Sequence, residues 1–339
     1  MSTVDFPPIE AVIPILQKRL RAPNLPGWLD PFVALLMLTL LVAALLPPTG
    51  YAATALGEIR GIVIAVVFFS AGLRLSPAAT WAGLKAWRLH TATLAMTFVI
   101  FPAVAALFAW TVTPWVSRDL ITGLLFLGAL PSVVQTSVAF TSVARGNTAA
   151  AVCAASLSSL AGVVVTPLLV LALIGSYAGI GLGQFGQVAV QLLLPFALGQ
   201  LLHARLAEWA GRHAFTLRWI DRGSVLMIVY SAFGGAVAGG VWHRLPAAQL
   251  LLVAVLCAAL LAIALALTSF GGRALGLEPG DRAVLVFCGS EKSLTIGLPM
   301  SAILFTGPLA GVVIIPVIVY HQLQLIVCSV VARHADRVI

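Results

Sequence analysis

A run of polar and charged side chains interrupts an apolar segment near the C-terminal end of the chain. It holds five polar residues within six positions, namely Ser290, Glu291, Lys292, Ser293 and Thr295. In a membrane-spanning segment each charged side chain costs at least about 2.5–3.5 kcal/mol. The carboxylate and the ammonium group therefore predict a binding site for a coupling ion or a substrate anion. An ion pair that only locks the fold is the alternative.

A second polar run lies in an earlier apolar segment. Gln135, Thr136 and Ser137 follow Pro131 there, and proline removes a helix hydrogen bond, so we expect the helix to break at this point. Unwound backbone at membrane depth is tolerated only where protein or water covers it. Paired breaks in two halves of a chain are typical of transporter binding sites. Hydrogen bonds between helices would explain the three polar residues equally well.

Two further polar residues, His321 and Gln322, fall in the last apolar segment. They are candidates for the same site, although packing or contact between helices is the commoner role for such residues. Glu291 and His321 could suggest acid–base catalysis, but the sequence has no HExxH motif and no second carboxylate placed at the same depth. The chain is therefore not expected to be an enzyme.

The composition indicates which elements must position these residues. Hydrophobic residues make up 61% of the 339 positions and charged residues 9%, whereas soluble domains carry roughly 25% charged residues. So few charges cannot cover a water-soluble chain of this length, so most of its surface must face lipid. Long apolar runs without strict alternation predict an all-α polytopic membrane protein. The net charge of +8 comes from Lys and Arg between the apolar runs, and this pattern argues against a nucleic-acid partner.

The apolar runs predict ten transmembrane helices, each of roughly 20 residues. They cover residues 31–48, 58–73, 88–112, 119–144, 148–174, 184–205, 220–241, 246–270, 282–305 and 308–331. This count places 15 Lys and Arg residues on one side of the membrane and three on the other. Positive charges gather on the cytoplasmic side, so both termini should be cytoplasmic. Residues 1–30 are expected to form a cytoplasmic segment with an interfacial helix from Ile9 to Leu20.

The sequence also resembles itself. Residues 162–170 and 311–319 are identical at five of nine positions, including a glycine and a proline. These segments belong to the fifth and tenth predicted spans, so residues 31–174 and 184–331 are expected to be two five-helix repeats joined by a glycine-rich turn at 179–181. Because each repeat has an odd number of spans, the two must be inverted relative to each other.

The order of several short motifs is similar to that of the bile acid/sodium symporter family, in its divergent symporter-like branch. The motifs are the run Gly72-Leu73-Arg74-Leu75-Ser76-Pro77, then Pro102, then Arg145-Gly146-Asn147, and finally Lys292-Ser293-Leu294 followed by Gly297-Leu298-Pro299-Met300. The resemblance implies that spans 1, 2, 6 and 7 form a panel and that spans 3–5 and 8–10 form a core. It also implies that the broken spans 4 and 9 cross in this core and bind sodium.

The resemblance assigns roles to particular residues. The glutamate that bridges the family's two sodium sites matches Glu291, and a ligand glutamine four residues later falls at Thr295. A ligand serine falls at Ser137, with Thr136 as its competitor, and another ligand glutamine falls at Thr97. Two further ligand positions are Ala151 and Ala155, which have no side-chain oxygen. A sodium ion at Glu291 is therefore the one candidate cofactor, and the ammonium of Lys292 could replace a second cation by pairing with the carboxylate.

These features predict a secondary active transporter that moves an organic anion or another small metabolite by alternating access. Sodium coupling, proton coupling and uniport all remain open. The alternative is an ion-binding membrane regulator, for example of calcium homeostasis, which moves no solute. In either case the protein should lie in the bilayer of a bacterial inner membrane or a plasma membrane.

Overall fold

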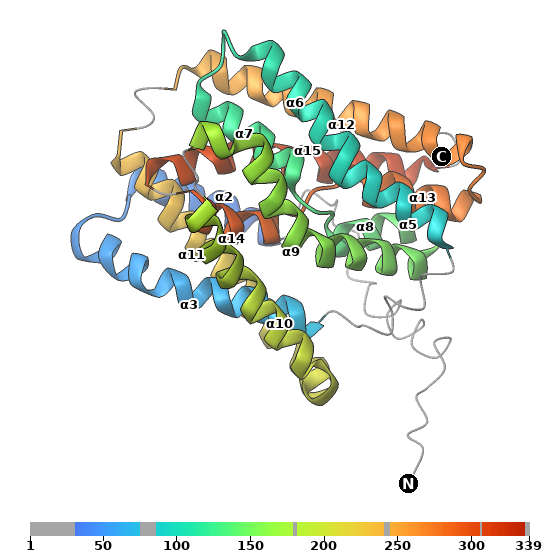
Figure 1. The fold of residues 1–339 in the computed structure, drawn as a ribbon, viewed down its shortest axis with the longest axis horizontal. Coiled ribbons are helices and arrows are strands. Elements are labelled where there is room, and N and C mark those ends of the chain that lie inside the picture. The colour runs from blue at the N-terminus through green and yellow to red at the C-terminus, as the bar shows by residue number, and fades with distance from the viewer. Residues whose placement is uncertain (1–30, 75–85, 179–181, 241–244, 306, 336–339) are drawn as a thin grey trace.

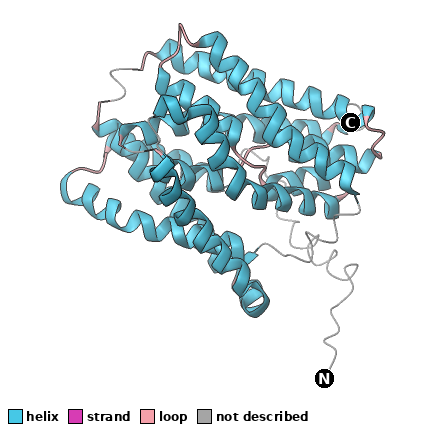
Figure 2. Cartoon of the chain, viewed as in Figure 1, coloured by secondary structure: helices cyan, strands magenta, loops and turns pink. Residues whose placement is uncertain are grey.

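The computed structural model describes residues 31–74, 86–178, 182–240, 245–305 and 307–335. All regular elements in these ranges are helices (Figure 2). The predicted interfacial helix at residues 9–20 and the glycine-rich turn at 179–181 lie outside the described residues.

Each predicted span of the first half coincides with one helix or with helices in series. The elements are α2 (Pro31–Leu45), α3 (Gly50–Arg74), α5 (Trp87–Ala95), the π-helical turn η3 (Met96–Ile100), α6 (Phe101–Val112), α7 (Arg118–Ala129), α8 (Val134–Val143) and α9 (Thr148–Ala178). The second span was predicted to begin at residue 58, but α3 begins eight residues earlier. Alanine is the strongest helix former, and the alanines of this stretch extend the helix toward Gly50.

The second half follows the same plan. Its helices are α10 (Leu182–Arg212), α11 (Ala214–Ala238), α12 (Ala247–Ala274), α13 (Pro279–Ser290), α14 (Leu294–Leu304) and α15 (Pro308–Arg333). The sixth span was predicted to end at residue 205, but α10 runs on to Arg212. Glu208 and Arg212 lie 3.8 Å apart one turn from each other, and such pairs support exposed helix ends.

Seven of the described helices are long and apolar enough to cross a bilayer. An eighth span results when α7 and α8, which are bent by 60° at their break, are counted together. The helix α2 is apolar but has only 15 residues. The chain is therefore an all-helical membrane protein in its described part, whereas ten crossings in two inverted repeats stay a prediction.

Two groups of helices can be followed in Figure 1. In the first, α3 lies along α10, and α11 contacts α2 and α3. In the second, α7 is surrounded by α6, α9 and α15, while α13 contacts α12, α8 and α5. The groups meet where α11 contacts α14 and α15 and where α10 contacts α9.

Two glycines allow α3 and α10 to approach closely. A Cβ atom at Gly72 would collide with the backbone carbonyl of Phe196, and one at Gly199 would collide with the backbone of Phe69. Backbone atoms cannot move aside as the end of a flexible side chain can. Small residues are a common means of packing helices in membranes, and here they fix the position of the helix that carries Arg74.

Gly199→Ala is therefore expected to lower the stability of the protein, although alanine favours helices by about 1 kcal/mol over glycine. The measurement is the melting temperature in detergent. Gly186→Ala on the same helix is the matched control, because a Cβ there meets no atom within 4 Å. Equal melting temperatures for the two variants would contradict the close packing of α3 and α10.

Candidate functional site

The predicted breaks of two helices are confirmed, and they lie side by side. The chain is extended at Leu130 and Val133 between α7 and α8, and again at Glu291 and Ser293 between α13 and α14. The amide of Ser293 donates a hydrogen bond to the carbonyl oxygen of Pro131 at 2.8 Å. The two unwound segments thus meet in the interior of the helix bundle.

Side chains of other helices satisfy the freed backbone groups of the first break. The hydroxyl oxygen of Ser158 accepts a hydrogen bond from the amide of Ser132 at 3.0 Å. The hydroxyl of Thr166 donates to the carbonyl oxygen of Ala129 at 2.8 Å. Both partners come from α9, so this helix supports the α7–α8 break.

Residues of α15 support the second break in the same way. Tyr320 donates its hydroxyl proton to the carbonyl oxygen of Ser290 at 2.6 Å. The amide of Gln324 bonds both the N–H and the carbonyl oxygen of Lys292, at 2.8 and 3.0 Å. His321 lies 3.0 Å from Gln324 and so helps to orient it. The predicted site residue His321 thus acts through Gln324 in this arrangement.

The carboxylate of Glu291 is fully buried and is held by the other break. Its Oε2 atom accepts hydrogen bonds from Thr136 at 2.6 Å and from Ser137 at 2.8 Å. Its Oε1 atom is also buried and has no hydrogen-bond partner among the described residues. The structure therefore brings Thr136 and Ser137 together around the carboxylate of Glu291, and it leaves the second oxygen of this carboxylate without a hydrogen-bond donor among the described residues.

The side chain of Lys292 points to a different place. Its ammonium group donates to the carbonyl oxygens of Thr97, Gly128 and Leu130 at 3.0, 3.0 and 2.8 Å. The nitrogen also lies 4.0 Å from the centre of the Phe101 ring, which is a cation–π distance. An ammonium has three N–H donors, so all three are used by these carbonyl groups.

The predicted pairing of Lys292 with Glu291 is wrong. No salt bridge joins the two side chains, and their polar groups contact different segments. Pairing would require both side chains to point to the same side of the unwound stretch. The stretch is extended instead, and successive side chains of an extended chain point to opposite sides.

The three carbonyl groups around Lys292 are free for physical reasons. Gly128 and Leu130 lie at the end of α7, where the last carbonyls of a helix have no partner within it. Thr97 lies in the π-helical turn, whose pattern pairs Phe101 N–H with the carbonyl oxygen of Met96. The next bond of this pattern would run from Pro102 to Thr97, but proline has no N–H.

The side chains of the remaining predicted residues form hydrogen bonds with neither Glu291 nor Lys292 in the described part of the chain. The hydroxyl of Ser290 donates to the carbonyl of Val286 in its own helix at 2.6 Å. The hydroxyl oxygen of Ser293 caps α14 by accepting from Ile296 N–H at 3.3 Å. Thr97 contributes its carbonyl, while its buried hydroxyl has no partner among the described residues, and neither does the Nε2 atom of Gln322.

A cavity of about 330 Å³ opens beside the two breaks, between α3, α8, α9 and α14. The polar residues that line it are Arg74, Gln135, Ser156, Ser159, Ser293 and Thr295. The uncapped N-terminus of α8 lies at its wall, since its N-cap residue Val133 also lines it. This places Gln135, Ser293 and Thr295 at one cavity, as a binding site would require.

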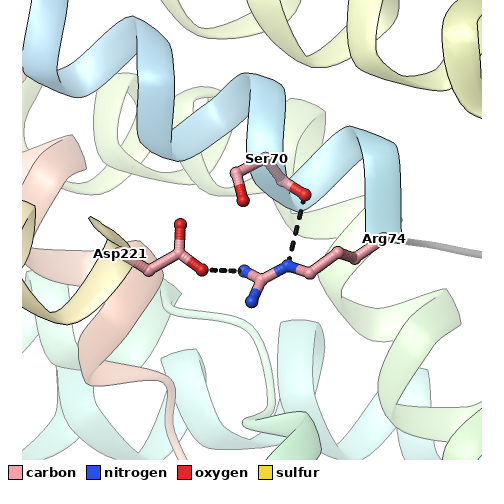
Figure 3. A network of polar contacts seen from close by, with 3 residues as sticks. All are labelled: Ser70, Arg74 and Asp221. Carbon is pink, nitrogen blue, oxygen red and sulfur yellow. Dashed lines mark hydrogen bonds and ion pairs between the residues drawn. The ribbon is translucent and has the colours of Figure 1, made fainter. Parts of the chain in front are cut away.

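Sequence reasoning missed Arg74 as a functional residue, because its position at the end of a span marked it as a topology-setting loop charge. Arg74 ends α3 and forms a salt bridge of 2.5 Å with Asp221 of α11 (Figure 3). Among the described residues that line the cavity, it is the charged one. Its position in the Gly72–Pro77 motif, which the sequence shares with the symporter family, could have marked it as a candidate functional residue.

Comparison with known proteins gives consistent matches over nearly the whole chain. Residues 30–337 match the SBF-like CPA transporter family (DUF4137). "Uncharacterized protein PA2026" of Pseudomonas aeruginosa is 44% identical over 91% of this chain and 93% of its own length. "Putative symporter YfeH" of Escherichia coli K12 is 41% identical over the same shares. Mouse "Sodium/bile acid cotransporter 7" is 29% identical over 79% of this chain and 80% of its own. The chain belongs to the SBF-like CPA transporter family.

Proposed function

We propose that this protein is a secondary active transporter that moves a small organic anion by alternating access. The observation that carries the proposal is the cavity beside the two helix breaks, which three predicted site residues line. Cavities at paired helix breaks are the usual substrate sites of such transporters. The printed names of the relatives, a symporter and a sodium/bile acid cotransporter, support the same class.

The helix contacts suggest how access would alternate. In this proposal α2, α3, α10 and α11 form the panel, and the remaining helices form the core, within two inverted repeats. The cavity lies between α3 and the core helices α8, α9 and α14, and so falls on the proposed boundary. Rocking of the panel against the core would open the cavity first to one side of the membrane and then to the other.

Coupling would involve a single cation at Glu291. Hard cations bind oxygen ligands, and the buried Oε1 atom, which has no hydrogen-bond partner among the described residues, would provide such a ligand beside the hydroxyls of Thr136 and Ser137. Ala151 and Ala155 provide no side-chain oxygen, and the ammonium of Lys292 already fills the carbonyl site. One sodium ion or one proton therefore fits better than two sodium ions.

Uptake into proteoliposomes tests this function. We expect labelled cholate, or another organic anion of a screened panel, to enter vesicles containing the protein faster than empty vesicles. An imposed sodium or proton gradient should accelerate uptake, and the gradient that does so identifies the coupling ion. Folded protein that moves no organic anion would contradict the proposal. If no anion were transported and cells that lack the protein showed altered calcium entry, the regulator hypothesis would be favoured.

A further inference from the structure

An anion in the cavity needs a positive partner, and Lys292 cannot serve. Its three N–H donors are bound to three backbone carbonyls, and its side chain is 2% exposed. The cavity walls instead present the guanidinium of Arg74. This group has five N–H donors in a planar fork that matches a carboxylate.

The neighbours of Arg74 use only some of the N–H donors of its guanidinium group. One terminal nitrogen pairs with Asp221, and the Nε atom donates to the carbonyl oxygen of Ser70 at 3.3 Å (Figure 3). The Arg74 side chain is 34% exposed, whereas that of Asp221 is 6% exposed. Arg74 thus pairs with a buried carboxylate, while its own side chain stays partly exposed and the residue lines the cavity.

The charged residues around the Arg74–Asp221 ion pair favour the binding of an anion in addition to the Asp221 carboxylate. A smaller cavity adjoins the first and shares Arg74, Gln135 and Thr295 with it. Among the described residues, its charged lining groups are Arg74, Arg218, Arg222 and Asp221. Three guanidinium groups against one carboxylate give an excess of positive charge, and such clefts concentrate anions.

We propose that Arg74 anchors the carboxylate of the substrate and that Asp221 is its resting counter-ion, which the substrate carboxylate displaces or joins. This inference rests on the proposed transport function. Gln135 and Thr295 line both cavities together with Arg74 and would supply hydrogen bonds to the same head group. Apolar residues such as Phe68 and Ile296 would contact the body of the molecule. The fitting ligand is therefore a monocarboxylate with an apolar body.

Thermal-shift titrations in detergent at constant ionic strength test this role. The probes are benzoate and sub-micellar cholate, with benzamide as the uncharged control. Asp221→Asn frees the guanidinium and should tighten carboxylate binding about tenfold or more, because charge-assisted bidentate pairing is among the strongest polar contacts. Arg74→Gln should abolish carboxylate stabilisation. Because it also strands a buried carboxylate, the neutral double variant Arg74→Gln/Asp221→Asn is measured beside it and should likewise fail to bind.

The results separate this role from a purely structural ion pair. A structural pair predicts that the double variant binds carboxylates as the wild type does, and that outcome would overturn the inference. The inference also fails if Asp221→Asn binds no tighter than wild type, or if no carboxylate stabilises either protein. Anion uptake that persists unchanged in the double variant would overturn the role of Arg74 and leave the transport function standing. Absence of uptake in wild type would instead overturn the transport function.

Discussion

Lys292→Ala is expected to lower the free energy of unfolding by about 3–5 kcal/mol and to make the folded protein respond to sodium. The substitution leaves three converging carbonyl groups without a donor and creates a cavity. It also removes the fixed positive charge closest in sequence to the buried carboxylate of Glu291. A small cation that enters the vacated site would coordinate the three carbonyl oxygens and restore the charge.

Melting temperatures in sodium and potassium buffers measure this effect. Sodium should raise the melting temperature of Lys292→Ala and hardly change that of the wild type. Lys292→Met, which fills most of the vacated volume, should respond less to sodium. A wild type that sodium, but not potassium, already stabilises strongly would contradict the idea that Lys292 replaces a cation.

Glu291→Gln is expected to reduce gradient-driven uptake by about 10–100-fold with little loss of stability. Glutamine keeps an acceptor oxygen for Thr136 and Ser137 but carries no charge for a coupling ion. A hydrogen bond to a charged group contributes about 1.5–3 kcal/mol, which corresponds to this range of affinity. The measurement is the initial rate of anion uptake under the stimulating gradient, together with the melting temperature.

Glu278→Gln is the matched control, because it makes the same chemical change at an exposed position just before α13. It should leave uptake unchanged. Gradient-driven uptake at wild-type rate in Glu291→Gln would show that the coupling ion binds elsewhere.

Local chemistry made the positions of the breaks predictable. Pro131 lacks the N–H of a helix hydrogen bond and is followed by a polar run, and the polar run from Ser290 to Thr295 cannot be buried without partners, so both breaks were expected from the sequence. Proline alone is not a sufficient signal, because Pro167, Pro195, Pro299 and Pro316 lie inside continuous helices. Helix ends were harder to place. Residues 206–212 extend α10 beyond the predicted span, and the charges of Arg205, Glu208 and Arg212 hide this extension from a search for apolar runs.

The arrangement inside the site depended on features that the sequence does not display. The ligands of Lys292 are carbonyl oxygens from two separate segments, and backbone atoms leave no mark in residue type. The opposite orientations of Glu291 and Lys292 follow from an extended conformation that composition alone did not predict. Arg74 was misassigned because counting loop charges cannot distinguish a charge facing solvent from one facing a cavity.

Accessibility of a single cysteine from both sides of the membrane tests alternating access most directly. Val152→Cys places a thiol at an exposed position of the cavity wall, whereas the four native cysteines are buried. Impermeant thiol reagents should modify this cysteine both in intact cells and in inverted membrane vesicles, and cholate should slow the reaction in both. Wild-type protein should react in neither preparation. Modification from one side only, whichever ions and anions are present, would contradict transport through this cavity.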